Sequence, residues 1–403
     1  MERLRRGKHS TMKKDDVDVA IVGGGPAGLT AANYAAGRGL TVKVFEEKGE
    51  IGFPVRCGEL LPATEEMRRL LPKAEGIQDL FDVPSSVIAN RCHRIRVLSP
   101  RGRSWEFDFR TNILQRHVFE RYLAEKAVRS GAEIIVGTHA ELFIEDGTKR
   151  VGSSKEDAVV ARMVVAADGF PSRAGLAAGL PIRPYMKPCS IALTSQYQMS
   201  NVKVEREVVE MYFDAHYAPG GFAWIIPKGG DVANVGVGAG ASFLRGRGGV
   251  GSLLDGFITR HPIAGDKLST GKPITMASDV LPVDGPISRS FTDSVLAVGD
   301  AAGMVIPTTG GGIPTAMITG KIAGEVAADH LTKGLPLSVH EGRWKEQIGE
   351  ELYNAARIRR VADKLMGDNL ILHGAFMLLG TNGIKDVITC KIPCIMRGLS
   401  FRL

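Results

Sequence analysis

The sequence has few cysteines, few aromatic residues and no long apolar runs. Five cysteines in 403 residues form an odd and sparse set, which argues against a disulfide framework and indicates a reducing cytoplasm. No apolar run approaches the roughly 18 residues of a membrane span, and the longest candidate, 370–379, is interrupted by His373 and Gly374. No apolar core follows the basic residues near the start, so no secretory signal is predicted. We therefore expect a cytoplasmic protein.

The positive net charge is concentrated at one end of the chain. Of the formal +7, residues 1–14 carry +5, which leaves +2 for the other 389 residues. This distribution predicts a basic, disordered arm at 1–14 and gives little support to a nucleic-acid partner. The arm either attracts the protein to anionic lipid headgroups or is only a solvated tail, with Met12 as the true start.

Glycine, in contrast, is abundant, with 49 residues that cluster at 23–28 and 310–312. A buried apolar run at 17–22 leads into Gly23-x-Gly25-x-x-Gly28 and then into an alanine-rich helical segment. In this dinucleotide-binding pattern the first glycine makes the turn, the second admits a pyrophosphate, and the third packs the helix on the strand. Glu46 follows a second strand, at 41–45, 23 residues after Gly23, near the position where an acid binds ribose hydroxyls.

Two later segments extend this pattern. Asp300 follows the buried run at 294–299 and precedes a glycine-rich helix start at Gly312 and Ile313, while Asp168 ends another buried strand at 159–167. Together the segments resemble the FAD-dependent class whose fold is typified by para-hydroxybenzoate hydroxylase. That resemblance implies FAD as the cofactor and an arginine contact from Arg116, whose alternative role is a solvated helix-cap arginine. We expect FAD contacts from Gly23, Gly25, Ala27, Gly28, Glu46, Cys57, Gly58, Arg116, Ala140, Asp300, Gly312 and Ile313.

Two further motifs narrow the family. PVRCGE places Cys57-Gly58-Glu59 after the second strand, and the segment 219–238 contains FAWIIP followed by Gly236-x-Gly238. These motifs resemble the geranylgeranyl reductase family, whose substrate pattern is Tyr-x-Trp-x-Phe-Pro followed by Gly-x-Gly. The chain has Phe222 and Ile226 in place of the two outer aromatics, which leaves the exact prenyl substrate open. The expected substrate-binding residues are Phe222, Trp224, Pro227, Gly236 and Gly238, with an ordinary sheet core as the alternative.

The resemblance implies an oxidoreductase that hydrogenates C=C bonds of geranylgeranyl chains in archaeal ether-lipid precursors, with peripheral membrane contact. Its electron donor, NADPH, ferredoxin or deazaflavin, stays open. The candidate catalytic residues are Cys57, otherwise an inert buried thiol, and Glu59, a proton source or a surface carboxylate. The alternatives are an FAD-dependent monooxygenase that also uses Asp168, or a non-catalytic prenyl-binding protein. Retention of Glu46 and Asp300 argues against the latter.

The predicted fold class is α/β. An FAD-binding, Rossmann-like domain (15–90, 105–180 and 281–335) is combined with an antiparallel-sheet substrate domain (91–104 and 181–280) and a helical C-terminal region (336–403). The histidines lack ligand spacing, so no metal is expected. Cys390 and Cys394, four residues apart, would share one face if that segment is helical, and packing cysteines are favoured over a zinc site.

Overall fold

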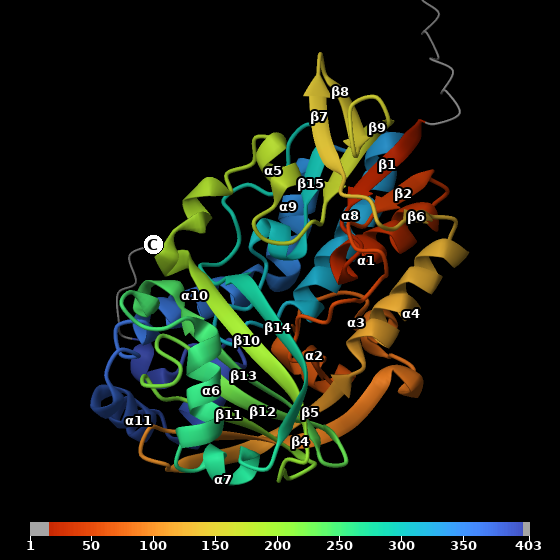
Figure 1. The fold of residues 1–403 in the computed structure, drawn as a ribbon. Coiled ribbons are helices and arrows are strands. Elements are labelled where there is room, and N and C mark those ends of the chain that lie inside the picture. Colours follow the sequence, from red (N-terminus) through yellow and green to blue (C-terminus); the bar gives the residue numbers. More distant parts are fainter. Residues whose placement is uncertain (1–15, 398–403) are drawn as a thin grey trace, which may run out of the picture.

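The computed structural model describes residues 16–397, so the arm predicted at 1–14 lies outside the described residues. A seven-stranded sheet forms the upper part of the molecule in Figure 1. Its strands are β6 (Glu133–Ile135), β2 (Val42–Phe45), β1 (Val17–Val22), β9 (Val159–Ala166), β8 (Thr148–Gly152), β7 (Glu141–Glu145) and β15 (Val295–Ala297), which pairs with β9. The pairs between β6, β2, β1, β9 and β15 are all parallel.

Helices cover the parallel strands of this sheet and bury them. The helices of this half are α1 (Pro26–Ala36), α4 (Arg116–Arg129), α5 (Arg173–Ala177) and α8 (Ile313–Lys333). Apart from Asp18, β1 is buried along its whole length, as expected for a strand between helical layers. The carboxyl ends of β1, β2 and β9 lead to the glycine turn, to Glu46 and to Asp168, so the predicted cofactor residues gather at one edge of the sheet.

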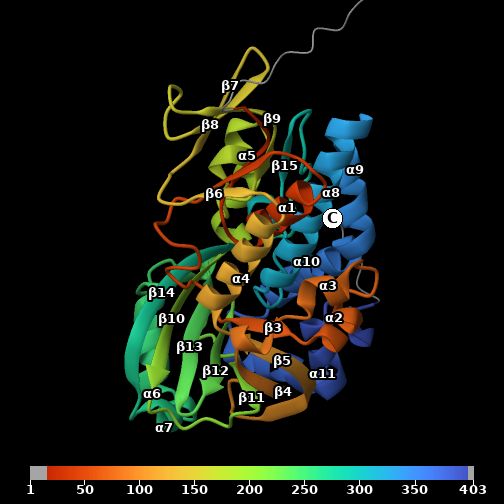
Figure 2. The ribbon, with the colours of Figure 1, turned by 90° about the vertical axis from the view of Figure 1, so that its right-hand side faces the viewer.

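A second, eight-stranded sheet forms the lower part of the molecule (Figures 1 and 2). Its order is β14 (Lys272–Pro282), β10 (Ile191–Ser200), β13 (Val232–Gly240), β12 (Phe222–Gly229), β11 (Val208–Tyr212), β4 (Ile88–Leu98), β5 (Ser104–Leu114) and β3 (Leu60–Pro62). Within this second sheet, among the described residues, the pair of β11 and β4 is parallel and the other strand pairs are antiparallel. The predicted antiparallel layer is therefore present.

The boundaries between the two halves differ from the prediction. The sheet that contains 181–280 also includes β3, the start of β4 at Ile88 and all of β5, although 15–90 and 105–180 were assigned to the cofactor half. The physical reason is the hairpin: β5 pairs with β4 along its whole length, so it cannot belong to another sheet. Helices α6 (Val250–Arg260) and α7 (Ala264–Leu268) cover one face of this sheet.

The helical C-terminal region is present as predicted. It contains α9 (Ser338–Trp344), α10 (Glu350–Ala362) and α11 (Asn369–Ile388), while the short helices α2 (Thr64–Leu70) and α3 (Ile77–Phe81) lie near β3. The condition for Cys390 and Cys394 to share a helical face is not met, because α11 ends at Ile388 and Cys390 adopts a positive φ of 61° beyond it. Cys390 is buried and Cys394 exposed. No helix within 16–397 is long and apolar enough to cross a membrane.

Candidate active site

One cavity of about 660 Å³ extends from the glycine turn of the first sheet to the strand β12 of the second. Most of the predicted site residues line it. The cavity wall includes Gly23, Gly25, Ala27, Glu46, Cys57, Gly58, Glu59, Arg116, Ala140, Phe222, Trp224, Gly238, Asp300, Gly312 and Ile313. Three predicted residues, Gly28, Pro227 and Gly236, are not part of the wall, and each lies behind it. The cofactor-type and substrate-type motifs thus line one shared cavity.

The three glycines of the first motif differ in their surroundings. A Cβ at Gly23, where φ is +105°, would overlap the carbonyl oxygen of Ala167. A Cβ at Gly28 would overlap the carbonyl oxygen of Gly23, so this glycine lets α1 approach the turn. At Gly25 nothing lies within 4 Å of a Cβ, because that position faces the cavity. The first and third glycines therefore serve packing, and the second leaves room for a ligand at the N-terminus of α1.

Glu46 is held in place beside this turn. Its side chain is buried, and its Oε2 accepts a hydrogen bond of 2.8 Å from the backbone N–H of Gly24. Its Oε1 accepts one of 3.0 Å from the backbone N–H of Lys48. Each carboxylate oxygen can accept a second hydrogen bond, so the carboxylate remains able to accept ribose hydroxyls in the cavity.

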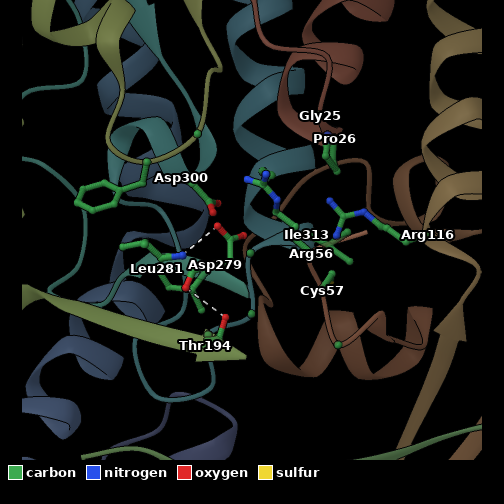
Figure 3. Close-up of a pocket in the computed structure, with 18 of the residues that line it drawn as sticks. Gly25, Pro26, Arg56, Cys57, Arg116, Thr194, Asp279, Leu281, Asp300 and Ile313 are labelled. Atoms are coloured by element: carbon green, nitrogen blue, oxygen red, sulfur yellow. Dashed lines mark hydrogen bonds between the residues drawn. The ribbon is translucent and has the colours of Figure 1, made fainter. Parts of the chain in front are cut away.

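Two carboxyl groups approach each other at the second cofactor element (Figure 3). Asp300 follows β15, and Asp279 comes from β14 of the second sheet. Burial, reinforced by the charge of Asp279, raises the pKa of Asp300 to about 6. Burial also raises the pKa of Asp279, whose Oδ1 accepts a hydrogen bond from the N–H of Val280. Gly312 and Ile313 begin α8 beside this pair, so unpaired backbone N–H groups face the cavity there.

Cys57 lies on the opposite side of the cavity, next to Arg116 (Figure 3). Its Sγ accepts a hydrogen bond of 3.1 Å from the backbone N–H of Glu59. Burial raises the pKa of the Cys57 thiol, and the neighbouring Arg116 opposes that shift. The Arg116 Nε donates to Glu120 at 2.6 Å. Although burial disfavours its charge, Glu120 and Cys57 raise the pKa of Arg116, so a fixed positive charge faces the thiol.

Glu59 joins three elements beneath the cavity. It is buried, with a positive φ of 66°, and its Oε1 accepts a hydrogen bond of 2.9 Å from the backbone N–H of Arg116. Its Oε2 accepts hydrogen bonds from Lys228 Nζ of β12 at 2.6 Å and from Asn234 Nδ2 of β13 at 2.7 Å. This arrangement makes Glu59 a clamp between the Cys57 loop, α4 and the second sheet, in place of a surface carboxylate.

Trp224 and the Gly-x-Gly motif form one packed unit. Trp224 is paired with Gly236 across β12 and β13, and a Cβ at Gly236 would overlap the indole ring. A Cβ at Gly238 would lie 3.5 Å from the same ring, an ordinary contact. Trp224 Nε1 donates to Gln196 Oε1 at 2.9 Å, and Gln196 Nε2 donates to the carbonyl oxygen of Cys57 at 2.9 Å. Gly236 therefore lets the indole lie flat on β13, and Gln196 connects it to the Cys57 loop.

The surroundings of Phe222 and Pro227 complete the wall. Phe222 lies 5.9 Å from Trp224 and 5.4 Å from Phe213 between ring centroids. Pro227 is buried, and its carbonyl oxygen accepts a hydrogen bond of 3.0 Å from Asn90 Nδ2, which anchors the end of β12 to β4. Phe222 and Trp224 thus form the aromatic part of the cavity wall on β12, and Pro227 is buried at the end of the same strand.

Asp168 has a local structural role. Its carboxylate accepts hydrogen bonds from Ser172 Oγ at 2.5 Å and from the backbone N–H groups of Arg173 and Ala174 at 2.7 and 2.9 Å. These bonds hold the loop that leads into α5 beside the cavity. Burial raises the pKa of Asp168, and the hydrogen bonds partly offset this effect.

Several cavity residues were not found from the sequence. They are Arg56, Gln196, Lys228, Asn234 and Asp279. Lys228 and Asn234 are connected to the site by hydrogen bonds to Glu59, and the other three residues line the cavity wall. A signal for Gln196 was present: Thr194, Gln196 and Gln198 alternate with the other residues of β10, which puts these polar residues on one face. Asp279 lies in the same cross-strand row as Thr194, because Thr194 pairs with Asp279.

Family comparisons agree with this geometry. A model of the geranylgeranyl reductase catalytic domain matches residues 190–278, and a model of an FAD binding domain matches residues 16–230. A lycopene cyclase model matches residues 274–376. The FAD binding domain match includes the glycine turn, and the catalytic domain match includes β12 and its Trp224, so both ends of the cavity lie within matched ranges.

Individual relatives point the same way. The chain is 34% identical over 365 residues to digeranylgeranylglycerophospholipid reductase 2 of Methanopyrus kandleri, covering 88% of this chain and 89% of the relative. It is 34% identical over 367 residues to the digeranylgeranylglycerophospholipid reductase of Methanocaldococcus jannaschii, covering 88% and 89%. The structure of a geranylgeranyl bacteriochlorophyll reductase-like protein from Thermoplasma acidophilum matches with a TM-score of 0.76 and 27% identity, covering 93% and 99%. A flavin-dependent brominase, 17% identical with a TM-score of 0.70 over 95% and 96%, shares the fold.

These matches define the class of the protein as an FAD-binding oxidoreductase of the α/β type. The chain belongs to the geranylgeranyl reductase family. The cavity fits FAD, since Gly25 leaves space at the N-terminus of α1 and a buried carboxylate with free acceptor capacity stands beside it. A second helix N-terminus, that of α8, faces the other end of the cofactor half. The predicted cofactor and fold class are confirmed.

Proposed function

We propose that this chain hydrogenates C=C bonds of geranylgeranyl chains in isoprenoid ether-lipid precursors. The observation that carries the proposal is the single cavity, in which the FAD-type turn at Gly25 and the aromatic wall at Phe222 and Trp224 face the same space. The reductases named among its relatives act on digeranylgeranylglycerophospholipid, which supports a prenylated lipid as substrate. An apolar wall suits such a chain, because each buried CH₂ contributes about 0.8 kcal/mol.

Reduced FAD, held at Glu46, Asp300 and the N-terminus of α8, would supply two electrons as hydride to one carbon of the double bond. The protein must then deliver a proton to the other carbon, and we assign this proton to Cys57 Sγ. Burial keeps the thiol protonated before transfer. After transfer the thiolate is stabilised by the Arg116 guanidinium and by the N–H of Glu59, which already donates to Sγ. Burial thus keeps the thiol protonated, while Arg116 and the Glu59 N–H reduce the free-energy cost of the thiolate that proton transfer leaves.

The other predicted residues act around this group. Glu46, Asp300 and the α8 N-terminus at Gly312 and Ile313 are proposed to hold FAD, with Ala27, Gly58 and Ala140 in contact along the wall. Glu59 is proposed as a positioning residue, because its carboxylate fixes the backbone that carries Cys57 and Arg116. Trp224 orients the prenyl chain while its link through Gln196 holds the Cys57 loop at the wall.

The function is tested by incubating the chemically reduced holoprotein with a geranylgeranyl lipid under anaerobic conditions and following the lipid by mass spectrometry. We expect a gain of two hydrogen atoms for each double bond reduced. Oxygen consumption coupled to a hydroxylated product would instead indicate a monooxygenase. Recovery of unchanged lipid from the reduced, FAD-loaded protein would contradict the proposal.

The role of Cys57 has its own test. Cys57→Ala should lower kcat on the lipid by about 100-fold or more, the usual contribution of a positioned proton donor. The visible spectrum of bound FAD and its reduction by a chemical reductant should not change. If Cys57→Ala reduced the lipid at the wild-type rate, the proton donor would have to be another group.

The electron donor is proposed to be an external reductant of one of three classes: NADPH, ferredoxin or deazaflavin. Anaerobic mixing with each donor, followed by the loss of oxidised FAD absorbance, distinguishes them.

We also propose that the protein acts at the membrane surface, since a substrate with two C20 chains is scarcely soluble. The basic segment 1–14 is one element that would favour such contact.

A further inference from the structure

The helix α11 presents an unusual outward surface. Leu370, Ile371, Met377 and Leu378 are 63%, 52%, 45% and 76% exposed, and we call these four residues the α11 apolar face. Leu370 and Ile371 are adjacent, and Met377 and Leu378 follow them seven residues later, about two helical turns along, so all four lie on the same side of the helix. No charged residue occurs between Asn369 and Ile384. A helix that is apolar on all sides is normally buried, so its exposed side needs a partner.

The inner side of the same helix belongs to the substrate wall. Leu372 and Phe376 are buried, and the Phe376 ring lies 5.0 Å from Phe213, which in turn lies 5.4 Å from Phe222. At the far end of the helix, Ile388 lines the cavity itself. One helix, about 10 Å across, therefore separates the α11 apolar face from the aromatic wall. Figure 2 shows α11 beside β4 and β5 at the lower edge of the molecule.

The charges near α11 favour an anionic surface. Lys364 precedes the helix, and Lys391 and Arg397 follow it, all three exposed. The nearby acidic groups are largely engaged within the protein. Asp363 accepts a hydrogen bond from Arg359, and Asp368 caps α11 by accepting hydrogen bonds from the N–H groups of Leu370 and Ile371. Ile395, 58% exposed, adds an apolar side chain to the segment after the helix.

We infer that the α11 apolar face lies in the surface layer of an anionic lipid membrane and positions the substrate wall next to its lipid. This inference rests on the proposed function, because a lipid substrate gives the face its occupant. Exposed apolar residues flanked by lysine and arginine are the features by which a helix binds in the plane of a membrane. The prenyl chain then passes from the membrane to Phe222 and Trp224 beside α11. The helix is interrupted at Gly380 (φ 57°, ψ −172°), so its two halves follow different directions along this path.

The test compares three forms of the full-length holoprotein. The variant Leu370→Gln/Leu378→Gln removes the apolar contact without changing the charge. Its matched control, Ile274→Gln/Met276→Gln, changes two residues on β14 that are 56% and 58% exposed. Co-sedimentation with vesicles of phosphatidylcholine and phosphatidylglycerol is measured, together with thermal unfolding. We expect the α11 variant to bind at least about tenfold more weakly, and the control to bind like wild type with both melting normally.

Activity assays separate this inference from the proposed function. On a detergent-solubilised prenyl lipid the α11 variant should retain wild-type kcat, whereas on vesicle-embedded lipid its rate should fall in step with binding. If no form reduces either lipid, the proposed function fails, while the sedimentation result still tests the membrane contact. Equal vesicle binding by wild type and the α11 variant would overturn the inference, and loss of binding on deletion of 1–11 would then assign the contact to the basic arm. A wild-type dimer that the α11 variant dissociates would also overturn it, because a second copy would be the occupant.

Discussion

At the scale of single residues, the two glycines of the Gly-x-Gly motif have different tasks. Gly236→Ala places a methyl group in the Trp224 indole, which must move away from Gln196. We expect a loss of about 1 to 3 kcal/mol in the free energy of unfolding, as for other overpacked sites, and a several-fold higher KM for the prenyl lipid. Gly238→Ala is the matched control, since its Cβ meets the ring at 3.5 Å. Equal effects of the two substitutions, measured by denaturant titration and kinetics, would contradict this role.

Asp300 makes the stability of the FAD-free protein depend on pH. Its folded pKa of about 6 exceeds the ordinary value of 3.8, so the folded protein retains a proton that the unfolded chain has lost. Stability should therefore decrease as the pH rises from 3.8 to about 6, by at most about 3 kcal/mol. Asp300→Asn should remove this decrease and be the more stable protein at neutral pH. The free energy of unfolding of both proteins is measured across this pH range. The same pH dependence in wild type and Asp300→Asn would show that the proton is not held by Asp300.

The residues found from the sequence are those whose signal is local. Glu46 follows its strand at a fixed distance from Gly23, and Asp300 follows a buried run directly, so neither depends on a distant partner. Gln196 and Asp279 belong to the site only because β13 and β14 flank β10 in the sheet. Strand order of this kind is set by long-range packing, which a short motif does not contain.

At the scale of elements, Glu59 is the clearest point of connection between α4, β12 and β13. Glu59→Ala leaves the Lys228 ammonium without its carboxylate in a mostly buried position. Breaking a buried pair in this way costs about 3 to 5 kcal/mol, and the free energy of unfolding should fall by that amount. Glu350→Ala removes a carboxylate from the exposed pair with Lys73 and should have no measurable effect. An unchanged urea midpoint for Glu59→Ala would refute the clamp.

The elements themselves were largely predictable, but their sheet membership was not. The antiparallel sheet predicted for 181–280 is present there, with β10 and β12 among its strands. β4 and β5 form one hairpin, yet the predicted domain boundary was drawn through it at residue 105. The alternating hydrophobic pattern of β5 indicates that one face of the strand is buried, but it does not indicate which sheet the strand joins. For the same reason the contact of α11 with the wall could not be derived from its sequence.

At the scale of the whole molecule, three parts of the chain close one cavity. The glycine turn and Asp300 come from the first half, Phe222 and Trp224 from the second sheet, and Arg359 and Ile388 from the C-terminal region. The C-terminal region contributes to the site through the side chains of Arg359 and Ile388 in the cavity wall. The packing of the C-terminal region against the first half therefore determines where these two side chains lie in the cavity.

His340 on α9 is part of that attachment and should make it sensitive to acid. The imidazole is fully buried, with Nδ1 3.5 Å from Ser290 Oγ, which also accepts a hydrogen bond of 3.0 Å from Trp344 Nε1. Burial lowers the pKa of His340 to about 4, and the charge of Glu341 only partly opposes this.

Because the unfolded chain takes up a proton near the ordinary value of 6.5, stability should fall as the pH decreases from 6.5 to about 4, by about 3 kcal/mol. His340→Gln should flatten this part of the pH profile, measured as the free energy of unfolding, whereas His93→Gln, which changes an exposed side chain, should leave it unchanged. An identical acid-dependent loss of stability in wild type and His340→Gln would mean that other groups control the docking of the C-terminal region.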